Sequence, residues 1–117
     1  MIVLPGGLPG AEHLAKSEKL KKIIQKMDKA KKYVTAICAA PWALSEAGVL
    51  KDKYTCYPSF EKVVNHAGYT PNEDVVVDKN VITSRGPATA FVFALELAKK
   101  LKGDETYKEL KKELLCK

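Results

Sequence analysis

The chain has 117 residues, 46% of them apolar and 29% charged, which is the size and composition of one soluble globular domain spanning residues 1–117. It contains no apolar run near the ~20 residues of a membrane helix and no signal peptide, so we expect a cytoplasmic protein without membrane contact. The net charge is +6, but Arg85 is the one arginine among 20 basic residues. Because base readout favours arginine, we expect solvated lysine-rich helix faces and no specific nucleic-acid partner.

The first half of the chain predicts two strands and two helices. Residues 2–4 form a short apolar strand that ends at a Pro-Gly-Gly turn. Ser17 is placed to cap a helix, after which apolar residues recur at helical spacing, namely Leu20, Ile23, Ile24 and Met27. Residues 33–37 are mostly apolar, as in a strand covered on both faces of a parallel sheet. Pro41 then suits the first turn of a helix that Gly48 ends.

The second half continues the alternation. We expect a short strand at 53–57, a brief helix over 60–67, and a hairpin whose strands, 75–77 and 81–83, flank Asp78-Lys79-Asn80. Pro87 opens an apolar helix that runs through Leu101 and is closed by Gly103. Asp104 caps a last helix, with one apolar face made of Tyr107, Leu110 and Leu114. Alternating strands and helices indicate an α/β fold with a mainly parallel sheet.

Three cysteines, Cys38, Cys56 and Cys116, occur without paired spacing. An odd number with no CxxC motif favours a reducing compartment over a disulfide framework. Only His13 and His66 could add further metal ligands, and the spacing fits no zinc site, so we expect no metal.

Cys38 follows the β-branched run at 33–37 directly, and Ala39, Ala40 and Pro41 lead from it into a helix. A nucleophile on such a turn projects into the crevice at the carboxyl ends of the strands, as in a nucleophile elbow. The start of the helix would stabilise a thiolate there. The alternative is a small, inert, buried cysteine.

Two other strand ends could join this site. Gly6 and Gly7 expose backbone N–H groups that could bind an oxyanion, although a Gly-Gly pair by itself is more often a plain turn. Arg85, in the stretch Thr83-Ser84-Arg85-Gly86-Pro87, offers a planar fork suited to a carboxylate. Its alternative is an ordinary surface salt bridge.

Together the motifs LPGG (from Leu4), AICAAP (from Ala36), T-x-YP (from Thr55) and ITSRGP (from Ile82) resemble the ThiJ/PfpI superfamily, from residue 2 to about residue 103. The resemblance is to its deglycase branch, a class I glutamine amidotransferase-like domain, rather than to its peptidase-like branch. It implies a flavodoxin-like three-layer α/β sandwich with a mainly parallel sheet, usually dimeric.

The resemblance also implies roles for single residues. Cys38 is the nucleophile, and the N–H groups of Gly7 and Ala39 are the oxyanion donors. The expected substrate-binding residues are Gly6, Tyr57, Arg85 and Pro87. The implied activity is a cofactor-free deglycase or glutathione-independent glyoxalase acting on methylglyoxal-type dicarbonyls and early glycation adducts. The alternative is a non-enzymatic oxidative-stress sensor or redox chaperone that uses an oxidisable cysteine.

Three departures accompany the resemblance. The family domain normally extends further at the N-terminus, where two strands, two helices and a proton-transferring glutamate lie, and Glu18 is not its equivalent. A frequent family histidine is Tyr57 here, and a glycine is Ala88. We therefore expect an incomplete sheet, and weak or absent activity for the chain alone. A truncated sequence, a companion chain supplying the missing half, or a homo-oligomer such as a dimer would each explain the shorter length.

Overall fold

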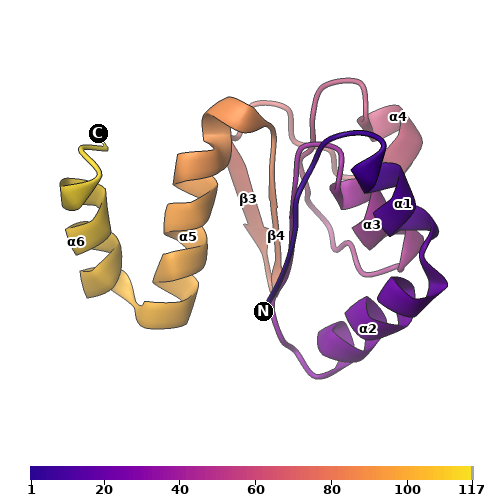
Figure 1. Cartoon of the computed structure of the whole chain (residues 1–117), viewed down its shortest axis with the longest axis horizontal. Helices are drawn as coiled ribbons and strands as arrows, with labels where there is room; N and C mark the ends of the chain where they lie inside the picture. The colour runs from indigo at the N-terminus through magenta and orange to yellow at the C-terminus, as the bar shows by residue number, and fades with distance from the viewer. Residues whose placement is uncertain (117) are drawn as a thin grey trace.

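The computed structural model describes residues 1–116 and contains one four-stranded sheet in the order β1-β2-β4-β3 (Figure 1). The strands β1 (Ile2–Leu4), β2 (Val34–Ile37) and β4 (Val81–Ser84) are parallel. The edge strand β3 (Val75–Asp78) pairs antiparallel with β4 through the predicted hairpin. The expected α/β fold with a mainly parallel sheet is confirmed, and β2 is central, as its apolar sequence indicates.

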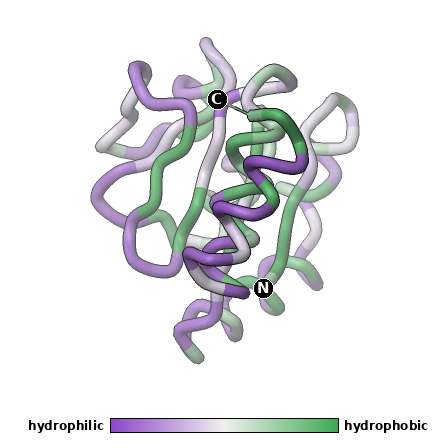
Figure 2. Tube along the Cα trace, turned by 90° about the vertical axis from the view of Figure 1, so that its left-hand side faces the viewer, coloured by the Kyte–Doolittle hydropathy of each residue, from purple (hydrophilic) through white to green (hydrophobic). Residues whose placement is uncertain are grey.

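Helices cover both faces of the sheet, so the molecule has three layers (Figure 1). On one side lie α1 (Gly10–Lys16), α2 (Glu18–Lys29), α3 (Pro41–Glu46) and α4 (Glu61–Val64). On the other side, a short 3₁₀ turn (Pro87–Thr89) leads into α5 (Ala90–Lys102), and α6 (Asp104–Glu113) packs outside α5. Figure 2 views the molecule from the α5–α6 side, with hydrophilic loops around the hydrophobic interior.

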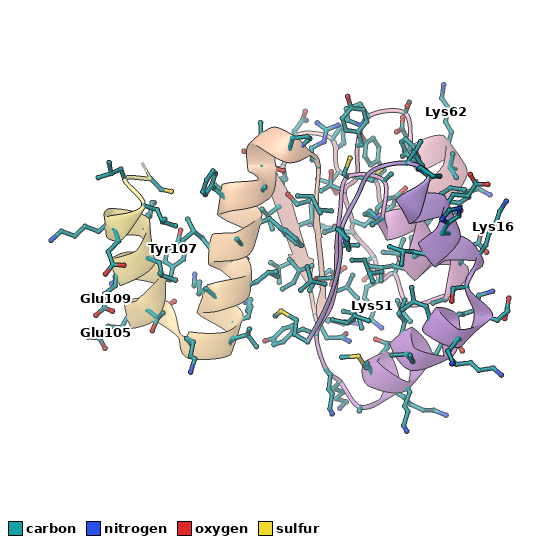
Figure 3. All side chains as sticks on the ribbon, viewed as in Figure 1. Lys16, Lys51, Lys62, Glu105, Tyr107 and Glu109 are labelled. Atoms are coloured by element: carbon teal, nitrogen blue, oxygen red, sulfur yellow. The ribbon has the colours of Figure 1, made fainter. Side chains whose placement is uncertain are left out.

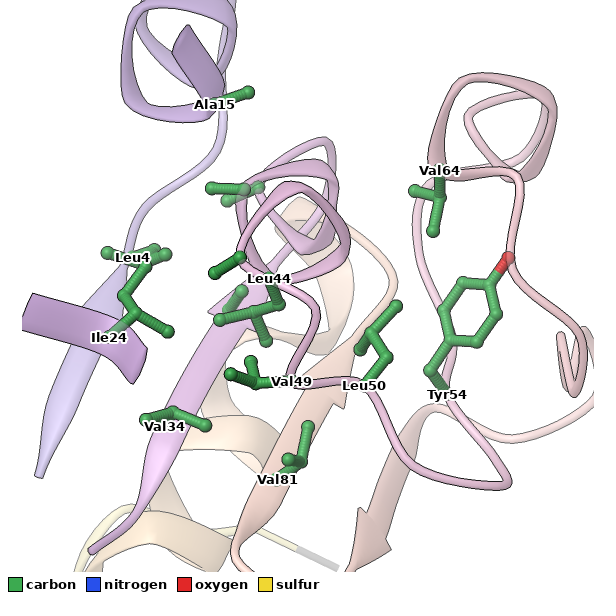
Figure 4. Packing of buried hydrophobic residues seen from close by; sticks show 14 of the residues in the cluster. Leu4, Ala15, Ile24, Val34, Leu44, Val49, Leu50, Tyr54, Val64 and Val81 are labelled. Atoms are coloured by element: carbon green, nitrogen blue, oxygen red, sulfur yellow. The ribbon is translucent and has the colours of Figure 1, made fainter. Parts of the chain in front are cut away.

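The larger hydrophobic core lies between the sheet and α1–α4 (Figure 4). Its members come from strands, helices and the segment after α3; those fully enclosed include Ile24, Val34, Leu44 and Tyr54. Burying one such aliphatic side chain contributes about 1.5–3 kcal/mol. A smaller cluster of Ile82, Phe93 and Leu97 joins α5 to the other face.

The expected helix cap at Ser17 is confirmed, because its side-chain oxygen accepts a hydrogen bond from the Leu20 N–H at 3.1 Å. The apolar stripe of α2 is narrower than we expected. Ile24 is fully buried, whereas Ile23 is 46% exposed and does not belong to the buried face.

The expected strand at 53–57 is wrong. Tyr54 forms only an isolated parallel bridge with Tyr69, outside the main sheet. The next backbone donors turn to other partners: Thr55 N–H binds the Thr83 side-chain oxygen, and Tyr57 N–H binds the Cys38 carbonyl. This segment therefore crosses the carboxyl ends of β2 and β4 and helps to build the surroundings of Cys38.

The last helix also differs from expectation. Asp104 is its first residue and Gly103 its N-cap, and none of its residues is buried. Leu114 follows the helix and is 50% exposed. Tyr107 lies toward α5 (Figure 3), with the Lys99 ammonium 5.2 Å from its ring centre.

Candidate functional site at Cys38

Cys38 occupies a sharp turn between β2 and α3, as the sequence predicts. Its φ is +66°, a left-handed conformation that costs a non-glycine residue roughly 1–3 kcal/mol. Two hydrogen bonds hold it: Cys38 N–H donates to the Ser84 carbonyl at 3.0 Å, and Tyr57 N–H donates to the Cys38 carbonyl at 2.8 Å. The end of β4 and the loop at Tyr57 thus fix the backbone that carries the thiol.

The turn after β1 lies against this cysteine. A Cβ atom at Gly6 would fall 2.5 Å from the Cys38 Cβ, 3.0 Å from the Ile37 carbonyl oxygen and 3.3 Å from Sγ. Only glycine allows the two turns to approach so closely. The structure therefore brings the Gly-Gly turn and Cys38 together.

A hollow of about 220 Å³ opens at this junction. Its lining residues are Gly6, Gly7, Ile37, Cys38, Gly86, Pro87 and Ala90. Cys38 is half-buried, and none of the other lining side chains is polar or charged. The thiol is thus the one reactive side chain in a small apolar hollow.

Two backbone donors near the thiol are free. Within residues 1–116, neither the Gly7 N–H nor the Ala39 N–H donates a hydrogen bond to another protein group. Gly7 has a φ of +91°, which glycine adopts without strain. Ala39 follows the thiol directly and is buried. Unpaired N–H groups beside a nucleophile are the type of donor that an oxyanion hole uses.

A second hollow of about 250 Å³ shares Gly86 and Pro87 with the first. Its further lining residues are Tyr57, Pro58, Asp74, Arg85, Ala88 and Thr89. Tyr57 is 44% exposed, and its ring limits the space beside Gly86, where a Cβ would lie 3.3 Å from the ring. The expected substrate-binding residues are therefore divided between the two adjoining hollows. Gly6 lines the first, Tyr57 and Arg85 line the second, and Pro87 lines both.

Arg85 is held by protein groups. Its guanidinium donates to the Cys56 carbonyl at 3.3 Å, to the Tyr69 hydroxyl at 2.8 Å and to the Pro71 carbonyl. It also lies 5.9 Å from the centre of the Tyr69 ring. Arg85 thus ties the loop after β4 to two other segments. Among the described residues, its guanidinium is neither in a surface salt bridge nor free to bind a carboxylate.

The remaining cysteines and histidines lie outside the hollow. Cys56 is fully buried, and burial, followed by the Glu61 charge, raises the pKa of its thiol to about 12 against the opposing effect of Arg85. His66 is half-buried, with its Nε2 2.7 Å from the Lys51 carbonyl oxygen. His13 is exposed on α1. In the described part of the chain, no three His, Cys, Asp or Glu side chains could hold a metal ion.

The family model that describes DJ-1/PfpI sequences matches residues 1–100 of this chain. The chain belongs to the DJ-1/PfpI family. Protein dj-1beta of Drosophila melanogaster is 41% identical over 117 residues, covering 98% of this chain and 63% of the relative. Its crystal structure matches with a TM-score of 0.92 over the same shares of the two chains, so the flavodoxin-like three-layer fold is confirmed.

Two further DJ-1/PfpI relatives carry names that mention an activity or an oxidation state. The glutathione-independent glyoxalase DJR-1.2 of Caenorhabditis elegans is 36% identical over 115 residues, covering 97% of this chain and 61% of the relative. The structure of Toxoplasma gondii DJ-1, oxidized, has 33% identity and a TM-score of 0.84, covering 95% of this chain and 61% of that chain. The chain thus spans less than two thirds of the length of these relatives.

Sequence reasoning missed part of the site. Ile37 and Ala90 line the hollow, although their apolar side chains gave no chemical signal. The role of Arg85 was also missed, since its three partners come from segments that the sequence does not connect.

No helix among the described residues is long and apolar enough to cross a membrane.

Proposed function

We propose that the protein is a cysteine-dependent glyoxalase or deglycase acting on methylglyoxal-type dicarbonyls and early glycation adducts. The observation that carries this proposal is the half-buried Cys38 thiol, held beside the free N–H groups of Gly7 and Ala39 in an apolar hollow of about 220 Å³. The similarity to the glyoxalase DJR-1.2 supports the same chemistry. The small volume of the hollow suits a three-carbon dicarbonyl.

The reaction begins when the Cys38 thiolate attacks the aldehyde carbon of methylglyoxal and forms a hemithioacetal. The aldehyde oxygen becomes an oxyanion, to which Gly7 and Ala39 donate hydrogen bonds. The proton on the aldehyde carbon then moves to the neighbouring carbonyl carbon, which converts the adduct to a lactoyl thioester. Water cleaves that thioester, releasing lactate and the thiol. One water is consumed, and one carbon is oxidised as its neighbour is reduced.

The proton transfer needs a base, and no carboxylate is among the described residues that line the hollow. The family resemblance assigns this step to a glutamate in a preceding segment. We therefore propose that the chain alone has low activity. The binding roles of Gly6 and Pro87 follow from their place in the hollow, while Tyr57 and Arg85 shape the adjoining one.

The test measures methylglyoxal consumption and lactate formation by the wild type, Cys38→Ser and Cys116→Ser. Cys116 lies beyond α6, outside the hollow, and is the matched cysteine control. We expect Cys38→Ser to abolish lactate formation and Cys116→Ser to leave it unchanged. Equal rates for wild type and Cys38→Ser would remove the enzymatic proposal.

A second candidate function is oxidation sensing. Cys38 is half-buried and opens into the hollow, so its thiol is accessible to a small oxidant, whereas Cys56 is fully enclosed. The similarity to oxidized Toxoplasma gondii DJ-1 favours this candidate. Two peroxide molecules would convert the thiol to a sulfinic acid and release two waters. Intact-mass and peptide analysis after mild peroxide should place two oxygens on Cys38, and random oxidation of the cysteines would reject the candidate.

We also propose a partner that covers β1, either a second copy or a companion chain, in a reducing cytoplasmic setting. Within the described residues β1 pairs only with β2, and Val3 on β1 is 46% exposed. An open strand edge with an exposed apolar side chain favours pairing with another chain. Native mass spectrometry tests this proposal, and a monomer at micromolar concentration would contradict it.

A further inference from the structure

A lysine-lined hollow of about 470 Å³ lies away from Cys38. Its lining residues are Asp28, Lys29, Lys31, Lys51, Lys79 and Asn80. They come from the end of α2, the segment after α3 and the β3–β4 turn, which leads into the amino end of β4. Cys38 instead follows the carboxyl end of β2, so the two sites lie at opposite ends of the parallel strands (Figure 1).

Hydrogen bonds hold three of the lining residues, Asp28, Lys51 and Asn80, in place. The Asp28 carboxylate accepts from the Lys51 ammonium and from the Asn80 amide, each at 2.8 Å. The same Asn80 amide donates to the Lys32 carbonyl at 2.9 Å, while the Asn80 carbonyl accepts from Val34 N–H. Figure 3 shows Lys51 near α2. The only carboxylate of the lining is thus already engaged by a lysine of the same lining.

The other lysines remain available to a ligand. Lys29, Lys31 and Lys79 form no ion pair with any residue between 1 and 116. After Asp28 and Lys51 neutralise each other, these three ammonium groups leave a net positive charge in the hollow. An adjoining hollow of about 510 Å³ shares Asp28 and Lys29 and adds Lys26.

The backbone at two of these lysines is unusual. Lys31 has a φ of +59° and Lys79 a φ of +57°, left-handed conformations that glycine and asparagine adopt most easily. Both turns instead carry a residue with a long cationic side chain, and both residues line the same hollow. The two turns therefore add charge to the hollow at a conformational cost.

We propose that this hollow binds an anion with several linked phosphate groups, an oligophosphate. Lysine binds phosphate as a compact point charge, and the volume is in the range of small-ligand sites. No aromatic side chain lines the hollow, so a base has no stacking surface there. The phosphate chain itself is recognised, whether it is inorganic or part of a nucleotide. This inference is independent of the chemistry at Cys38.

The test is isothermal titration of the full chain with orthophosphate, tripolyphosphate and ATP at about 0.15 M salt, where surface charges are strongly screened. We expect the affinity to rise at least about tenfold from orthophosphate to tripolyphosphate, and ATP to bind within about threefold of tripolyphosphate. Binding that does not rise with phosphate number, or no saturable binding, overturns the proposal. So does a preference for ATP greater than about tenfold, since contacts to the base would then dominate.

Two double variants with the same loss of charge locate the site. Lys31→Gln/Lys79→Gln should weaken tripolyphosphate binding about tenfold or more, whereas Lys108→Gln/Lys112→Gln on α6 should change it less than about twofold. Both pairs are exposed, and thermal melts check that the variants fold. Equal weakening by both pairs would show dependence on net charge alone and overturn the proposal. Tighter binding of a duplex DNA fragment would also overturn it, in favour of a nucleic-acid surface.

Discussion

Gly6 lies against Cys38 where the turns after β1 and β2 meet, so closely that a Cβ at position 6 would lie only 2.5 Å from the Cys38 Cβ. This close approach places the Gly-Gly turn against the thiol, and Gly7 lines the same hollow as Cys38. The left-handed turn at Cys38 and the missing side chain at Gly6 are therefore parts of one arrangement.

Gly6→Ala should disturb this arrangement. The new methyl group meets the Cys38 Cβ and the Ile37 carbonyl, neither of which is the end of a flexible side chain, so one turn must shift. We expect a loss of about 1–3 kcal/mol in the free energy of unfolding and a changed rate of Cys38 alkylation. Gly10→Ala is the matched control, because nothing lies within 4 Å of its Cβ position. Equal melting temperatures for the two variants would contradict the contact.

Cys56 should be unreactive in the native protein. Burial is the main cause that raises the pKa of its thiol to about 12, so only about one molecule in ten thousand carries the thiolate at pH 8. Peptide mapping after iodoacetamide treatment should show label on Cys38 and Cys116 in the native chain, and on Cys56 only in guanidinium chloride. Labelling of native Cys56 as fast as Cys116 would show that the core around it opens readily.

Asp28 should make stability depend on acid pH. Burial alone would raise the pKa of its carboxyl, but the hydrogen bonds from Lys51 and Asn80 and the Lys51 charge together lower it below 3.8. The unfolded state thus binds the proton more readily than the folded state. The stabilisation is therefore complete above about pH 4 and is lost as pH falls through the lowered folded-state pKa.

Asp28→Asn should consequently lower the free energy of unfolding at pH 7 by about 1.5–3 kcal/mol. Below the folded-state pKa the difference from wild type should shrink, because wild-type Asp28 is then protonated. Urea unfolding at pH 7 and at the lowest pH where the wild type still folds measures both effects, and Glu109→Gln on exposed α6 is the control. A deficit of the same size at both pH values would show that the carboxylate charge is not responsible.

The geometry of the Cys38 turn was predictable because its signals are local. The β-branched run, the small residues and Pro41 are consecutive, and they dictate a strand, a tight turn and a helix start. The hairpin around Asp78-Lys79-Asn80 and the cap at Ser17 are local in the same sense. Joining the Gly-Gly turn to Cys38 required one further rule, that the carboxyl ends of parallel strands meet at one edge.

Features that depend on distant partners were not predictable in this way. Asp28 meets Lys51 and Asn80 across 23 and 52 positions of sequence, so nothing in the local pattern marks the lysine-lined hollow. The segment 53–57 has the composition of a strand, but its neighbours in space draw its N–H groups to side-chain and turn acceptors. Tertiary contacts there override the local preference for a strand.

Arg85→Lys should destabilise the fold rather than weaken substrate binding alone. Arginine donates to Cys56, Tyr69 and Pro71 from a planar fork, and a lysine ammonium cannot reach three acceptors with that geometry. We expect a loss of about 2–3 kcal/mol in unfolding free energy, and about 1 kcal/mol for Tyr69→Phe, which removes one of the three acceptors. Urea unfolding measures both losses, and steady-state kinetics with methylglyoxal supplies the second readout. If Arg85→Lys instead keeps wild-type stability and only raises KM, then Arg85 binds a substrate group directly and its structural role is wrong.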